Sequence, residues 1–242
     1  MYTRILKLWA VDMRQNWRDP MSLVALLSPI AVAGALRFLL PVAALYLDPY
    51  VEIMAYYPAI LGMVIMFPAM LSGMLGGFLM LDERDDGTLY ALQTTPLSGR
   101  QYVFYRILSP VVMGILLALL MVALLGSSGV PLTSLIMAAT LSGLMGPIWA
   151  YGMYALAENK IEGLAVLKFM SLLIGLPLLS LFIPASYTPL FWVLPFFWPF
   201  YLVAGPALGM ATMSPAAMFA AGLLVSGIYL AGLSHQVAKR QA

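Results

Sequence analysis

The sequence predicts an all-α integral membrane protein with six transmembrane helices. Of its 242 residues, 63% are hydrophobic and only 9% are charged, whereas a soluble domain carries about 25% charged residues. Six apolar runs reach the length of about 20 residues that a spanning helix needs. These runs lie at 21–40, 56–81, 107–126, 132–157, 163–183 and 212–233.

The distribution of basic residues predicts the topology. Apart from Arg37, every Lys and Arg lies near a terminus, between the second and third spans, or around the loop between the fourth and fifth. Six spans place all of these residues on one face, which the positive-inside rule assigns to the cytoplasm. We therefore expect a multi-pass protein of the inner (plasma) membrane with both termini in the cytoplasm. The residues are Arg4, Lys7, Arg14, Arg18, Arg84, Arg100, Arg106, Lys160, Lys168, Lys239 and Arg240.

Residues 1–20 predict an amphipathic helix that lies on the inner leaflet before the transmembrane domain at 21–242. Apolar residues such as Leu8 and Trp9 recur at helical spacing, while other positions are basic, as at Arg4. The segment has no small-residue cleavage site before a short apolar core, so we expect no signal peptide.

The apolar segment at 185–209 predicts a re-entrant or interfacial hairpin on the outer side. A seventh span here would move the basic C-terminus to the outside, against the positive-inside rule. Repeated proline also breaks helices, and dense Trp and Phe suit a membrane–water interface. The prolines are Pro184, Pro189, Pro195, Pro199 and Pro206.

Arg37 is the basic residue that falls inside a span. If the helix starts at Met21, its rise of 1.5 Å per residue places Arg37 about 25 Å higher, near the outer interface. We expect it to extend to the interface or to pair with Asp48 or Glu52 in the following loop.

Small residues recur within the second and fourth predicted spans. Such patterns let helices approach closely, either inside one subunit or between two copies. The residues are Gly73, Gly76 and Gly77, and Ser142, Gly143 and Gly146.

Charge concentrates in a loop at 82–106, between the second and third spans. Such a segment cannot lie in hydrocarbon, so we expect it to face water. We expect the acids at 82–86 to begin a short helix, Gly87 to bend it, and Pro96 to stop it. The charged residues are Asp82, Glu83, Arg84, Asp85, Asp86, Arg100 and Arg106.

The order of residues in this loop resembles a known family. The run Glu83-Arg84-Asp85-Asp86-Gly87-Thr88-Leu89, followed by Thr95-Pro96-Leu97-Ser98, is similar to the first cytoplasmic loop of type-2 ABC transporter permeases. These are the membrane subunits of bacterial and archaeal drug, antibiotic and polysaccharide exporters. The chain departs from the family pattern where Asp85 replaces a Glu and where Tyr105-Arg106 replaces Gly-Lys.

The resemblance implies how the loop acts. In this family it forms a coupling helix that docks in a cleft of a separate ATP-binding subunit, and residues 21–242 form the permease domain. A second, smaller contact would come from Glu158, Lys160 and Glu162. The residues of the main contact would be Glu83, Arg84, Asp85, Asp86, Gly87, Thr88 and Leu89.

ATP binding is expected on a partner and not on this chain. None of the four lysines follows a glycine, so the chain has no P-loop of the form G-x-x-x-x-G-K-[ST]. We therefore expect a transporter subunit that is not an enzyme and binds no cofactor, with ATP and Mg²⁺ on the partner. Six helices make half of the usual pathway, which implies a homodimer or a heterodimer with a related permease.

Two other functions are open from the sequence. An ion-coupled drug carrier needs buried ionisable groups, which the spans almost lack. A membrane-embedded Mg²⁺-dependent transferase would use Asp82, Asp85 and Asp86, but no second acidic cluster is present. A net charge of +2 argues against nucleic acid as a partner. The expected substrate is amphipathic or hydrophobic.

Overall fold

The computed structural model describes residue 14 and residues 18–47, 49–87, 99–127 and 129–241. The predicted interfacial helix at 1–20 falls almost entirely outside these ranges. Thr88 and Leu89, predicted as part of the coupling helix, also lie outside them.

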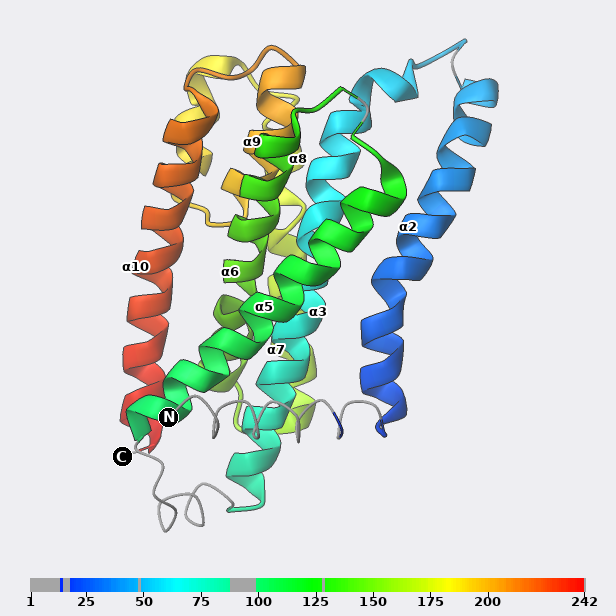
Figure 1. Cartoon of the computed structure of the whole chain (residues 1–242). Coiled ribbons are helices and arrows are strands. Elements are labelled where there is room, and N and C mark those ends of the chain that lie inside the picture. The colour runs from blue at the N-terminus through cyan, green and yellow to red at the C-terminus, as the bar shows by residue number, and fades with distance from the viewer. Residues whose placement is uncertain (1–13, 15–17, 48, 88–98, 128, 242) are drawn as a thin grey trace.

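Six helices in the described part of the chain are long and apolar enough to cross a membrane. They match the six predicted spans and confirm the all-α membrane fold (Figure 1). The helices are α2 (Pro20–Leu47), α3 (Tyr57–Asp85), α5 (Gly99–Leu125), α6 (Leu132–Leu156), α7 (Lys160–Leu173) with its short continuation α8 (Leu176–Leu179), and α10 (Pro215–Gln241).

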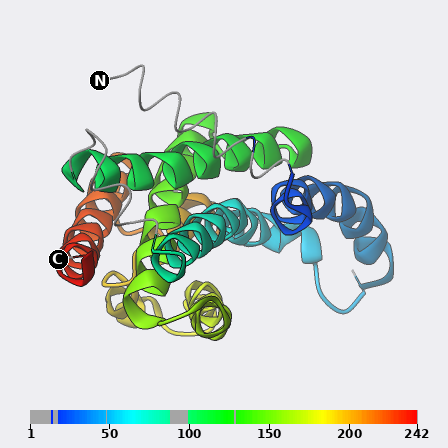
Figure 2. The same cartoon turned by 90° about the horizontal axis from the view of Figure 1, so that it is seen from below.

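Helices α3 and α6 form the centre of the bundle. In their most apolar stretches 67% of the residues are buried, against 17% in α2 and α10. Figures 1 and 2 show α2 and α10 at opposite edges, with α5 crossing the bundle obliquely between them. The outer helices therefore expose most of their apolar surface, as helices in contact with lipid do.

Close contact between α3 and α6 depends on glycine. A Cβ atom added at Gly73 would lie 2.4 Å from both the carbonyl oxygen of Gly146 and the Cβ of Trp149. Buried hydroxyls join the same helices, because Ser142 donates to the carbonyl oxygen of Ile65 at 2.7 Å. The small residues therefore pack helices within one subunit, and this geometry accounts for them without a second copy.

The segment at 185–209 does not span. It forms a 3₁₀ helix, η2 (Ala185–Phe191), and a buried helix, α9 (Phe197–Ala207). The 11 residues of α9 reach about 16 Å, roughly half of the hydrocarbon thickness. Stacking of Phe197 on Tyr201, with ring centroids 4.7 Å apart, helps to hold α9 inside the bundle. The segment is therefore not a seventh span, and its re-entrant position in the membrane stays a prediction.

Helix α3 continues past its predicted end at residue 81. Its 29 residues reach about 44 Å, which exceeds the hydrocarbon core of about 30 Å. Figure 1 shows its last turns projecting beyond the neighbouring helices. It stops at Asp85 because Gly87 takes a left-handed conformation, with φ of 66°, and donates to the carbonyl oxygen of Arg84 at 3.2 Å.

The acids at 82–86 therefore end a helix, and the prediction that they begin one is wrong. The helix dipole disfavours negative charge at a C-terminus, so these acids need cationic neighbours. The predicted loop at 82–106 is shorter than expected on both sides, since α3 continues to Asp85 and α5 already begins at Gly99.

At the opposite end of the bundle, side chains satisfy the last carbonyl oxygens of α5. The Arg37 guanidinium donates to the carbonyl oxygen of Leu124, and the Tyr57 hydroxyl donates to the next carbonyl at 2.8 Å. The last carbonyl oxygens of a helix have no hydrogen-bond partner within it, and the helix dipole favours a cation at the C-terminal end. Arg37 thus binds a helix end and not Glu52; its other expected partner, Asp48, lies outside the described residues.

We expect Gly73→Ala to lower the free energy of unfolding by about 1–3 kcal/mol, because the added methyl group meets backbone of α6. The control is Gly232→Ala in α10, where an added Cβ meets nothing within 4 Å. That change should be neutral or slightly stabilising, since Ala favours helix by about 1 kcal/mol. Unfolding by SDS in mixed micelles measures both, and equal midpoints would contradict the packing argument.

Candidate functional site

At the charged end of the bundle α3 and α6 end and α7 begins, and α5 passes beside them at Arg106, about two turns after its start. Three consecutive residues of α3 each reach a different neighbour. Glu83 contacts α5, Arg84 contacts the end of α6, and Asp82 contacts the start of α7. We call these three residues and their partners, Arg106, Ala157 and Lys160, the clasp.

The ion pair between Glu83 and Arg106 is the buried part of the clasp. The Arg106 side chain is 6% exposed and that of Glu83 17%. The guanidinium also lies 5.4 Å from the ring centroid of Tyr105. Burial removes water from both charges, and their mutual attraction offsets part of that cost. The pair joins the two helices that enclose the loop at 86–98.

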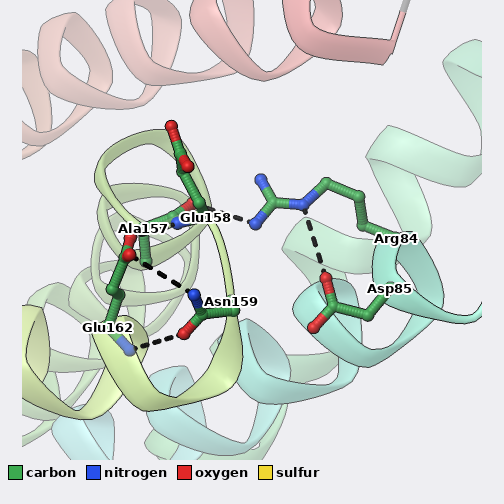
Figure 3. Close-up of polar contacts among 6 residues, drawn as sticks. All are labelled: Arg84, Asp85, Ala157, Glu158, Asn159 and Glu162. Atoms are coloured by element: carbon green, nitrogen blue, oxygen red, sulfur yellow. Dashed lines mark hydrogen bonds and ion pairs between the residues drawn. The ribbon is translucent and has the colours of Figure 1, made fainter.

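Arg84 connects α3 to the end of α6. Its guanidinium donates to the carbonyl oxygen of Ala157 at 3.0 Å (Figure 3). It also lies 5.0 Å from the ring centroid of Tyr154. The cation thus meets the negative end of the α6 dipole and the face of an aromatic ring. Asp85 lies 4.0 Å from the Arg84 side chain and points into solvent.

The third contact joins α3 to α7. Lys160 donates to the carboxylate of Asp82 at 2.8 Å and lies 5.6 Å from the ring centroid of Phe78. Both charged side chains are more than 40% exposed, so this pair contributes little to stability. It brings a cation close to the acidic end of α3.

The turn before α7 is held by reciprocal capping. The Asn159 side chain accepts a hydrogen bond from the amide of Glu162 at 2.9 Å. The Glu162 carboxylate accepts one from the amide of Glu158, also at 2.9 Å. Such a capping pattern defines the start of α7. Figure 3 shows this turn facing the end of α3, so the two predicted contact regions lie side by side.

The predicted contact residues divide into two groups. Glu83 and Arg84 are partly buried and contact neighbouring helices, which the sequence does not show. Asp85 and Asp86 are exposed beside the exposed turn at 158–162. We call Asp85 and Asp86 the acidic tip.

Sequence reasoning missed the structural role of Arg106. It treats this residue only as a basic position after the loop, because nothing in the spacing shows that the side chain is buried against Glu83.

The pairing of Asp82 with Lys160 argues against the transferase alternative, which would use the Asp82 carboxylate to bind Mg²⁺. Within the described ranges, no group of three His, Cys, Asp or Glu residues is arranged to hold a metal ion.

Comparison with known proteins gives one family and two relatives. The model of a family described as "Fluoroquinolones export permease protein Rv2686c-like" matches residues 12–234. Two relatives from Mycobacterium tuberculosis, strains CDC 1551 and H37Rv, are named Fluoroquinolones export permease protein MT2760 and Rv2686c. Each is 31% identical over 195 residues, which cover 77% of this chain and 76% of the relative. No solved structure matches.

We expect Glu83→Gln and Arg106→Gln each to lower the free energy of unfolding by about 3–5 kcal/mol, because each breaks a mostly buried ion pair. The double variant should lose clearly less than the sum of the two, since both single variants remove the same interaction. The exposed pair supplies the control: Asp82→Asn with Lys160→Gln should cost no more than about 1 kcal/mol. Additive losses at Glu83 and Arg106 in SDS unfolding would contradict a buried, coupled pair.

Proposed function

This chain belongs to the Rv2686c-like family of fluoroquinolone export permeases, and from that premise we propose that it is the membrane subunit of an ATP-binding-cassette exporter. Its relatives are named as export permeases, so it is a multi-pass membrane permease for export. The resemblance of the loop after α3 extends this statement to ATP-driven transport. ATP and Mg²⁺ then belong to a separate subunit, since this chain has no P-loop lysine.

The observation that carries the proposal is the clasp at the projecting end of α3. Each of Asp82, Glu83 and Arg84 reaches a different helix, so the end of α3, where the coupling segment begins, is joined to the bundle. A partner that pushes on this segment moves α5 through Arg106 and α7 through Lys160. Packed helices respond to such displacement by switching between discrete arrangements.

The partner docks on the acidic tip and on the loop that follows it. Asp85 and Asp86 project past the other helix ends, and their charges complement a basic cleft. The turn with Glu158, Lys160 and Glu162 lies beside them and makes the second contact. Glu83 and Arg84 then shape the docking surface from below, through their contacts with α5 and α6.

The remaining assignments follow from the same proposal. The charged end faces the cytoplasm of a cell with both termini on that side, in the inner (plasma) membrane. Two permeases, either identical or related, form one pathway, and α2 and α10 offer largely unburied surfaces to lipid or to the second copy. The substrate is an amphipathic or hydrophobic compound, and the names of the relatives suggest fluoroquinolones.

A pull-down of the tagged chain from its native host tests the proposal directly. Recovery of a P-loop ATPase with two copies per two permeases is the expected result. An ATPase-free preparation that still transports the drug would instead support an ion-coupled carrier. Mg²⁺-dependent turnover by the chain alone would support a transferase.

We expect the double change Asp85→Lys and Asp86→Lys to reduce recovery of the ATPase at least about tenfold, because like charges then meet across the contact. Folding should persist, since lysine at a helix C-terminus complements the dipole. The matched control is Glu52→Lys, a charge reversal at the opposite end of the bundle, which should leave recovery unchanged. Full recovery with the double variant would remove the acidic tip from the docking surface.

A further inference from the structure

A cavity of about 590 Å³ lies at the end of the bundle opposite the clasp. One wall is the turn between α2 and α3, including η1 (Ile53–Tyr56), and the other comes from the segments around α8 and α9. Its volume falls in the range of sites for drug-sized ligands. Its lining includes Tyr50, Glu52, Tyr56, Leu181, Leu208 and Met210.

Both walls are held by hydrogen bonds, so the cavity is formed without a ligand. In the first wall, the amides of Tyr50 and Val51 both donate to the carbonyl oxygen of Leu47 at 2.8 Å. In the second, the Tyr201 hydroxyl donates to the carbonyl oxygen of Met210 and accepts from the amide of Thr212, at 2.8 and 3.1 Å. Preformed walls reduce the ordering cost of binding.

The charge in the cavity is negative. The Glu52 carboxylate does not cap η1, and no described side chain forms an ion pair with it. Arg37, the basic residue of α2, is occupied by the carbonyl oxygen of Leu124. The loops at 41–55, 127–131 and 184–211 contain no Lys or Arg. Among the described residues that line it, the cavity therefore presents one carboxylate, that of Glu52, without a cationic neighbour from these loops.

We propose that this cavity binds an amphipathic organic cation with a single positive charge. The Glu52 carboxylate neutralises the charge, and the rings of Tyr50 and Tyr56 attract it through their faces. Leu181, Leu208 and Met210 contact the apolar body of the ligand. The inference rests on the proposed function, and it names the substrate class that the permease holds on the outer side. An uncharged or anionic compound of similar size lacks the carboxylate contact.

The test is binding of tritiated tetraphenylphosphonium to the immobilised full chain in nonionic detergent, measured by scintillation proximity. We expect saturable binding that uncharged triphenylphosphine oxide does not displace. Glu52→Gln should weaken binding about fivefold, the size of one partly exposed charge contact, whereas Glu52→Asp should keep most of it. Tyr56→Leu should weaken binding, and Tyr56→Phe, which keeps the ring face, should not.

Folding of each variant is checked by its unfolding midpoint in SDS, which these exposed positions should leave unchanged. Equal affinity of Glu52→Gln and the unchanged chain, or displacement by triphenylphosphine oxide, would overturn the proposal. Absence of saturable tetraphenylphosphonium binding would overturn it as well. No ATPase takes part in this assay, so such a result leaves the exporter assignment to be decided by the pull-down alone.

Discussion

Close packing of α3 against α6 is the constraint on which the rest of the structure depends. Gly73 and Gly146 let the two backbones meet where any side chain would intervene. Because the central helices cannot slide past each other without breaking this contact, the height at which α3 ends is determined relative to α6. That height places three successive residues of α3 opposite Arg106 of α5, the end of α6 and the start of α7.

The clasp explains why acids are tolerated at the C-terminus of α3. The dipole opposes them there, but Arg106 and Lys160 supply opposite charge from α5 and α7. Arg84 in turn donates a hydrogen bond to the carbonyl oxygen of Ala157 at the end of α6. The five residues from Asp82 to Asp86 therefore form an inner group and an exposed group. The inner residues contact α5, α6 and α7, and the acidic tip is exposed.

The two ends of the bundle differ in charge and in construction. At the charged end, ion pairs connect α3 to α5 and to α7, so a displacement of one helix also displaces its neighbours. At the opposite end, Arg37 and the Tyr57 hydroxyl close the end of α5, and Glu52 faces a cavity with aromatic and aliphatic walls. An exporter of the proposed kind needs this asymmetry, since it receives force on one side and releases substrate on the other.

Apolar run length and the placement of Lys and Arg determined six spans and a non-spanning hairpin from sequence alone, because each depends on local composition and on the thickness of the bilayer. Loop chemistry also predicted the candidate contact residues, and their contact with a partner stays a prediction. Three-dimensional packing alone decided that α3 continues to Asp85, that Arg106 is buried against Glu83, and that Arg37 binds the carbonyl of Leu124. These partners are far apart along the chain, and only the register of packed helices brings them within hydrogen-bonding distance.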